Sequence, residues 1–330
     1  MLTYLQAELS LTHRRAHRGA YTRGDGVTKI RSFVVAVTLI VGWLAVVTDP
    51  AARAATNRWP RTVVNGFSTP TGSGFWLVYA DGSVSRQGSA LLYGDTSGIA
   101  LHGPIGGGAA APSGTGYWLV ATDGGIFTYG SARFHGSMGD SRVNQPVFSM
   151  APTKTGRGYW LVARDGGIFT FGDAHFYGSM GDKKLNQPIN GIGTSPSGRG
   201  YRMVARDGGI FSFGDVRFYG SLPGLHVNVS DVVGVAPTPT NKGYWIARRG
   251  GQVYAFGDAP NYGSYAASAC DRLVAIFSNP TTPGYRLVTQ SGATVPFGTA
   301  PGGSGITGTP GACPIPVPQS PVQSPRSIGG

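Results

Sequence analysis

Residues 158–179 read GYWLVARDGGIFTFGDAHFYGS, and versions of this stretch recur along most of the 330-residue chain. The Gly-aromatic start of the stretch occurs six times, at intervals of 41 to 43 residues. A fixed period of this length, with several short apolar runs in each copy, is typical of repeat proteins whose neighbouring units cover one another. The six starts are Gly74, Gly116, Gly158, Gly200, Gly243 and Gly284.

Each repeat contains four candidate strands, which in the third copy are residues 147–150, 159–163, 168–171 and 176–179. An Asp-Gly-Gly turn joins the second candidate to the third, and Asp-Gly between two such runs predicts a β-hairpin because these residues tolerate positive φ. The second candidate is apolar throughout, which predicts a strand buried on both faces. The glycines that end the third candidate predict sharp exits from the sheet.

Four short strands in about 42 residues predict one blade of an all-β protein, a β-propeller of six blades. Seven blades are the alternative count, and an open β-solenoid is a third possibility. The last repeat lacks a clear fourth strand. Residues 57–64, which include Trp59, are expected to supply it and so to close the ring.

The chain divides into three parts: residues 1–54, a propeller at 55–305, and a Pro/Ser/Gly-rich tail at 306–330 that is expected to be flexible. Residues 33–48 are an apolar run with a basic flank before it and the small-residue sequence Ala-Arg-Ala after it. This order predicts a secretory signal peptide, and a retained membrane-anchor helix is the alternative. We therefore expect a secreted or extracytoplasmic protein that meets the membrane only through residues 33–48 if they are not cleaved.

The two cysteines fit an oxidising compartment. Cys270 lies between the fifth and sixth repeats and Cys313 lies in the tail. We expect a disulfide between them that ties the tail to the propeller, with two free thiols as the alternative.

The net charge of +12 falls to +8 once residues 1–54 are removed, and the remaining basic residues do not form a run. This pattern argues against nucleic acid as a partner. A mildly basic surface suits acidic polymers, although ordinary solvated surface charge is the simpler interpretation.

Motifs for catalysis are missing from the sequence after residue 54. This part has no Glu, its Asp residues recur at turn positions, and it has no G-x-S-x-G motif. The histidines and cysteines lack metal-ligand spacing, and phosphate-loop and dinucleotide fingerprints are absent. We therefore expect no catalytic residues, no metal and no cofactor.

At the repeated blocks the chain resembles actinobacterial secreted proteins built from GYWLVA-x-DGG-I-F-x-FGDA-x-FYGS repeats. The resemblance covers residues 60–300. The chain is also more distantly similar to tectonin-type and chromosome-condensation-regulator-type β-propellers. The resemblance implies a secreted, propeller-like module whose usual role is binding. The cell-wall hydrolase or peptidase domain that often accompanies these repeats is not found in this chain.

Basic residues near the ends of the second strand are the candidate ligand contacts. A Trp two residues after the repeat glycine recurs in four repeats, and a filling role between blades is favoured over sugar stacking. Arg replaces this Trp in repeats four and six, and breaks in symmetry are better candidates than repeated residues. If the loops gather at one end of the ring, they form basic rims around the central channel. The candidate ligand-binding residues are Arg157, Arg199, Arg202, Lys242 and Arg286, with Arg164, Arg206, Arg248 and Arg249 near the other end of the strand.

The sequence thus predicts a monomeric, non-catalytic binding or scaffold propeller at the bacterial cell envelope, with a cell-wall polymer or an envelope protein as its partner. An extracellular hydrolase or lactonase that uses the channel is the first alternative. A structural adhesin or spacer is the second.

Overall fold

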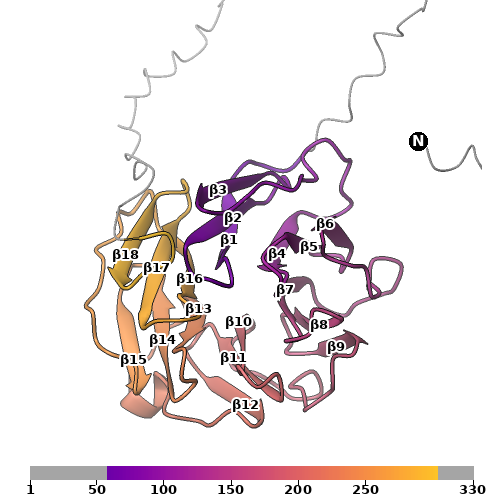
Figure 1. Cartoon of the computed structure of the whole chain (residues 1–330). Coiled ribbons are helices and arrows are strands. Elements are labelled where there is room, and N and C mark those ends of the chain that lie inside the picture. The colour runs from indigo at the N-terminus through magenta and orange to yellow at the C-terminus, as the bar shows by residue number, and fades with distance from the viewer. Residues whose placement is uncertain (1–57, 304–330) are drawn as a thin grey trace, which may run out of the picture. The chain divides into compact units, whose positions relative to one another are not determined.

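The computed structural model describes residues 58–303, where eighteen strands form six three-stranded antiparallel sheets. Each sheet uses three consecutive strands, so each sheet is one blade (Figure 1). The inner strands are β1 (Val63–Ser68), β4 (Ile105–Ala110), β7 (Val147–Pro152), β10 (Ile189–Thr194), β13 (Val232–Pro237) and β16 (Leu273–Ser278). The middle strands are β2 (Gly74–Tyr79), β5 (Gly116–Ala121), β8 (Gly158–Ala163), β11 (Gly200–Ala205), β14 (Gly243–Arg248) and β17 (Gly284–Thr289). The outer strands are β3 (Val84–Gly88), β6 (Ile126–Gly130), β9 (Ile168–Gly172), β12 (Ile210–Gly214), β15 (Val253–Gly257) and β18 (Thr294–Gly298).

The six inner strands contact one another in sequence, and β16 returns to β1, so the blades form a closed ring around a central channel (Figure 1). This confirms the predicted all-β, six-bladed propeller. The predicted signal or anchor segment at residues 33–48 and the tail at 306–330 lie outside the described residues. Within residues 58–303, no helix is long and apolar enough to span a membrane.

The predicted fourth strand of each blade is wrong. Residues 176–179 follow β9 without joining its sheet, and the corresponding segments of the other blades behave in the same way. The reason lies in the glycine that ends the outer strand, because Gly172 has a φ of 65° and turns the chain away from the edge. The Tyr of this segment then packs against the next blade, as Tyr177 does on Tyr201. The preceding Phe stays on the surface, with Phe134, Phe176 and Phe218 between 54% and 60% exposed.

The predicted closing strand at residues 57–64 is also wrong. Val63 begins β1, an inner strand of the first blade, and Trp59 packs at the contact between the first two blades. The last blade meets the first through hydrogen bonds instead. The Val63 N–H donates to the carbonyl oxygen of Gln290 at 3.3 Å, and the Gly302 N–H donates to that of Gly72 at 3.0 Å.

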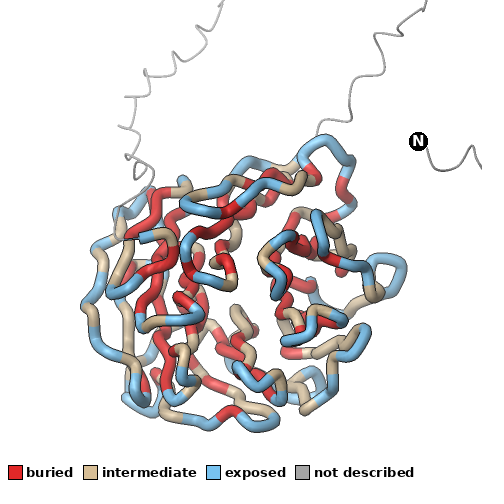
Figure 2. Tube along the Cα trace, viewed as in Figure 1, coloured by how far each residue is buried: buried red, intermediate tan, exposed pale blue. Residues whose placement is uncertain are grey.

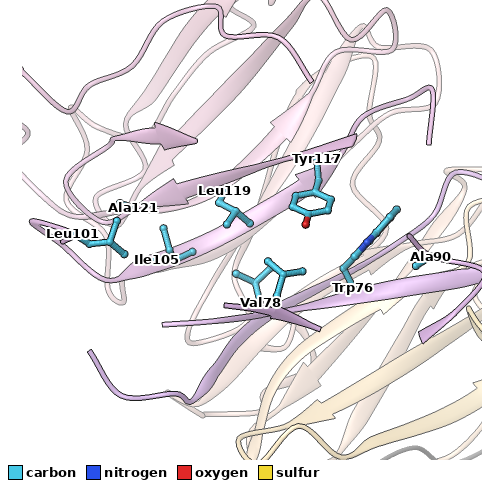
Figure 3. Packing of buried hydrophobic residues seen from close by; sticks show 9 residues of the cluster. Trp76, Val78, Ala90, Leu101, Ile105, Tyr117, Leu119 and Ala121 are labelled. Atoms are coloured by element: carbon cyan, nitrogen blue, oxygen red, sulfur yellow. The ribbon is translucent and has the colours of Figure 1, made fainter. Parts of the chain in front are cut away.

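The hydrophobic core is divided among the contacts between adjacent blades, which we call seams and number by the two blades that meet. The middle strands β5 and β8 are buried at every residue, as the apolar run predicts (Figure 2). At seam 1–2, Trp76 and Val78 of β2 face Tyr117 and Leu119 of β5 (Figure 3). Because a three-stranded sheet cannot cover both of its faces alone, each blade depends on two seams for burial.

A tyrosine hydroxyl fixes each seam that has a Tyr after the middle-strand glycine. The Tyr159 hydroxyl donates to the carbonyl oxygen of Gly136 at 2.6 Å and accepts from the N–H of His135 at 3.1 Å. Burial raises the pKa of Tyr159, although these backbone hydrogen bonds act in the opposite direction, so the hydroxyl remains a donor at neutral pH.

We predict that Tyr159→Phe lowers the free energy of unfolding by about 1–3 kcal/mol, because two backbone groups lose their partner inside the seam. Denaturant unfolding measures the change. The matched control is Tyr129→Phe, since the next blade already holds Phe171 at that position of the outer strand. Equal losses in the two variants would contradict the role of the Tyr159 hydroxyl.

Candidate functional site

The inner strands enclose a cavity of about 1010 Å³, which residues of all six blades line. Each inner strand has a bulge after its first residue, so the register with the middle strand shifts there. Bulges of this kind redirect side chains at the rim of a sheet. In the fourth blade the bulged residue is Asn190, which lines the cavity.

One backbone position of each blade forms one end of this cavity, and we call these six residues the channel mouth. Each directly follows the last residue of the middle strand of its blade. Its N–H donates to the carbonyl before the inner strand of its own blade, and its carbonyl accepts from the first inner-strand N–H of the next blade. The channel-mouth residues are Ala80, Thr122, Arg164, Arg206, Arg249 and Gln290, and all six line the cavity.

Three consecutive blades therefore place an arginine at the channel mouth. The Arg164 guanidinium lies over the Phe148 ring, with Cζ 4.6 Å from its centroid, and Nη1 donates to Asn190 Oδ1. Asn190 Nδ2 in turn donates to the carbonyl oxygen of Val232 at 2.8 Å. Burial and the positive charge of Arg206 lower the pKa of Arg164. Two guanidinium groups that repel each other in a partly enclosed space favour an anion between them.

Carboxylates do not neutralise this cluster. Of the described residues that line the cavity, Asp231 alone carries a carboxylate, and its Oδ1 lies 2.8 Å from Nε of Arg248. The hydrogen bond to Asp231 raises the pKa of Arg248, so this pair stays ionised. Within residues 58–303, neither Arg206 nor Arg249 forms an ion pair.

Three of the predicted ligand-binding residues lie elsewhere. Arg157, Arg199 and Lys242 are exposed, sit in the loops that join inner to middle strands, and do not line the cavity. An aspartate after the outer strand accompanies each of these loops. Asp215 lies 3.7 Å from Arg199 and accepts a hydrogen bond from Ser197. This face of the ring therefore carries compensated charge.

The equivalent aspartate of the third blade, Asp173, accepts hydrogen bonds from Thr153 and Thr155. Burial acts to raise its pKa, but these hydrogen bonds and the charge of Arg157 outweigh burial and lower the pKa. The pKa of Asp215 is lowered in the same way. Burial acts to raise it, but the hydrogen bonds to Ser197 and Ser195 and the charge of Arg199 outweigh burial.

The other two predicted residues, Arg202 and Arg286, are 0% exposed and lie within seams 4–5 and 6–1. The Arg202 guanidinium packs on Tyr244 and that of Arg286 packs on Phe75, each with Cζ 4.8 Å from the ring centroid. Both side chains are therefore packed between blades and closed to solvent, and a role for them in binding stays a prediction. The tryptophans of the other four seams, Trp76, Trp118, Trp160 and Trp245, are buried in the same place.

The sequence placed Arg164, Arg206 and Arg249 near a strand end without singling them out, and it gave no indication of Asn190 or Asp231. The available clue was that Arg fills one repeat position in three successive blades, where the other blades have Ala, Thr and Gln.

Among residues 58–303, no three His, Cys, Asp or Glu side chains lie together in a way that could hold a metal ion. Cys270 is disulfide-bonded, and its predicted partner Cys313 lies outside the described residues, so this pairing stays a prediction.

The structure is similar to the β-propeller domain of Cps50 (Swd1) from Myceliophteria thermophila. The TM-score is 0.49 with 11% sequence identity, and the match covers 69% of this chain and 79% of that chain. No family model and no curated protein matches the chain. The propeller assignment therefore rests on the six sheets themselves.

The lowered pKa values of Asp173 and Asp215 predict a specific acid sensitivity. A carboxyl group whose pKa is lower in the folded state stabilises the protein above its unfolded pKa of about 4, and this contribution is lost as the pH falls through the folded value. The double variant Asp173→Asn/Asp215→Asn should lose less stability than the wild type between about pH 5 and pH 2. Thermal unfolding across this range measures the difference. The control is Asp140→Asn, in an exposed loop. The prediction would be contradicted if the double variant and the wild type lost the same stability as the pH falls.

Proposed function

We propose that this propeller is a non-catalytic binding module that holds an anionic ligand at the channel mouth. The observation that carries the proposal is the convergence of Arg164, Arg206 and Arg249 from three adjacent blades on one end of a cavity. Asp231, the carboxylate among the described lining residues, is already paired with Arg248. Such a site attracts phosphate or carboxylate groups, with an affinity that salt weakens.

Arg164 supplies a preorganised part of the site. Its contact with Phe148 and its hydrogen bond to Asn190 hold the guanidinium in place before any ligand arrives. A donor that is already ordered loses less entropy on binding than a mobile surface lysine. Arg206 and Arg249 then provide the charge that is free to meet the ligand.

The aspartates support binding over catalysis. Those of the hairpin turns accept the N–H two residues later, as Asp165 does from Gly167 at 2.9 Å, and Asp173 and Asp215 bind hydroxyl groups. General acid–base catalysis requires a titratable group directed at the substrate. The carboxylates of these turns and loops instead hold backbone N–H and hydroxyl groups of their own segments.

We further propose that the module acts at the bacterial cell envelope, with an anionic cell-wall polymer as its ligand. The support is the sequence of residues 33–48, which is typical of a secretory signal peptide or an anchor, together with the basic channel mouth. A hydrolase that uses the channel and a structural spacer are the outcomes that the following experiment distinguishes from binding.

The double variant Arg206→Gln/Arg249→Gln should bind a poly(glycerol phosphate) oligomer about tenfold or more weakly than the wild type, because two charges next to the ligand are removed. Its dependence on salt concentration should also be flatter. Isothermal titration at two NaCl concentrations measures both. The matched control is Arg157→Gln/Arg199→Gln, which removes the same charge from the opposite loops and should bind as the wild type does.

If Arg157→Gln/Arg199→Gln weakens binding as much as Arg206→Gln/Arg249→Gln does, the ligand binds at the exposed loops and not at the channel mouth. Absence of binding by the wild type at both salt concentrations would favour the spacer. Shortening of the oligomer during the titration, detected by chromatography, would favour the hydrolase.

Neutralising Asp231 should have the opposite effect. We predict that Asp231→Asn binds the same oligomer several-fold more tightly, because Arg248 loses its counter-charge and adds to the positive potential at the channel mouth. Titration at low salt gives the largest difference. Weaker binding by Asp231→Asn would show that the carboxylate itself contacts the ligand.

A further inference from the structure

Five of the six seams between blades follow one rule. In four of them a Trp of the middle strand packs near the Tyr of the next blade, with ring centroids 5.1 to 5.8 Å apart. The indole N–H of each Trp donates to a backbone carbonyl fifteen residues later at 2.8 Å, so the buried nitrogen is satisfied. The acceptors are the carbonyl oxygens of Leu91, Arg133, His175 and Pro260.

At seam 6–1 an arginine obeys the same rule. Arg286 packs on Phe75, and its Nε donates to the carbonyl oxygen of Pro301, again fifteen residues later and at 2.8 Å. Its Nη1 donates to Thr294 Oγ1 at 3.0 Å and its Nη2 donates to the carbonyl oxygen of Gly303. This guanidinium is therefore satisfied by the protein.

Seam 4–5 breaks the rule. Arg202 is 0% exposed and packs on Tyr244, but Nε and Nη1 have no partner among the described residues. Nη2 makes a long contact of 3.5 Å with the carbonyl oxygen of Asn241. Two further buried polar atoms lack partners here, Ser212 Oγ and Asn241 Oδ1. Ser212 is the cross-strand neighbour of Arg202, so the two side chains share one face of the blade.

An unneutralised guanidinium in a seam is costly. Burial penalises the charged form and lowers the pKa of Arg202, while Tyr244 and Tyr219 offset this only in part. No carboxylate of the described residues pairs with Arg202. Buried charges in proteins are normally paired, and each unsatisfied buried donor adds a further penalty.

We propose that seam 4–5 binds a small inorganic anion of the chloride type, held by Nε and Nη1 of Arg202 and by the Ser212 hydroxyl. An anion supplies the counter-charge and accepts from several donors at once, whereas a water molecule supplies an acceptor without charge. Rotation of the Asn241 amide exchanges its oxygen and nitrogen, which turns this side chain into a further donor to the same anion. The site is separate from the channel mouth and acts as a structural anion site between two blades.

The test compares the thermal unfolding of the wild type in sodium chloride, sodium bromide and sodium gluconate at equal ionic strength. A ligand that binds only the folded state raises the unfolding midpoint with its concentration. We expect the midpoint to rise with chloride and bromide but not with the bulky gluconate. Anomalous diffraction from crystals grown in bromide should place an ion beside Arg202.

Arg202→Trp restores the residue of the other four seams, and it should fold but lose the difference between chloride and gluconate. Ser212→Ala removes one donor and should weaken the chloride affinity by about tenfold, which keeps the test valid if Arg202→Trp does not fold. Arg206→Gln/Arg249→Gln controls for anions at the channel mouth and should retain the wild-type difference. Arg286→Trp, which removes the satisfied arginine, should retain it as well.

Equal midpoints for the wild type in chloride and gluconate, or bromide density at the channel mouth alone, would overturn the proposal. The Arg202 donors would then be satisfied by water. Loss of the chloride effect in Arg206→Gln/Arg249→Gln but not in Arg202→Trp would overturn it equally.

Discussion

The structure depends on six backbone hydrogen bonds that join each blade to the next at the channel mouth. The first N–H of each inner strand donates to the carbonyl oxygen of the channel-mouth residue of the preceding blade. The Ile105 N–H donates to Ala80 at 3.0 Å, and the Val63 N–H donates to Gln290 at 3.3 Å. Each blade buries its middle strand only against its neighbours. These hydrogen bonds and the packing of the seams therefore depend on each other. The longest of the six closes the ring, where residues distant in sequence must meet.

The same backbone position leaves its side chain free to vary. Hydrogen bonds fix the peptide groups of Arg164, Arg206 and Arg249, but the structure makes no equivalent demand on what these residues carry, since Ala80 and Gln290 occupy the position elsewhere. A repeat built in this way can change the chemistry of its channel without disturbing its closure. Differences between blades at this position are therefore where the proposed binding function can vary, whereas the repeated Trp, Tyr and Gly serve the packing of the blades.

Much of the fold could be predicted from the repeat, because period, hairpin turns and an apolar middle strand are local properties. The absence of a fourth strand could not be predicted. It depends on whether Tyr177 joins its own sheet or packs on Tyr201 of the next blade, and the sequence of one repeat does not show this. Arg202 could not be placed for the same reason. Its departure from Trp marks it as unusual in the sequence, but only the neighbouring blade shows that it is buried over Tyr244.

Basic residues at both ends of the middle strand look alike in the sequence, and their electrostatic surroundings separate them. Arg199 lies in a loop between an inner and a middle strand and pairs with Asp215, which follows the outer strand. The positive charge of this loop is therefore compensated within the protein. At the channel mouth the carboxylate of Asp231 pairs with Arg248. Arg164 and Arg206 both line the cavity, where the charge of Arg206 lowers the pKa of Arg164. A bound anion would relieve this repulsion, and this is the electrostatic argument for proposing the channel mouth, and not the more exposed face, as the ligand site.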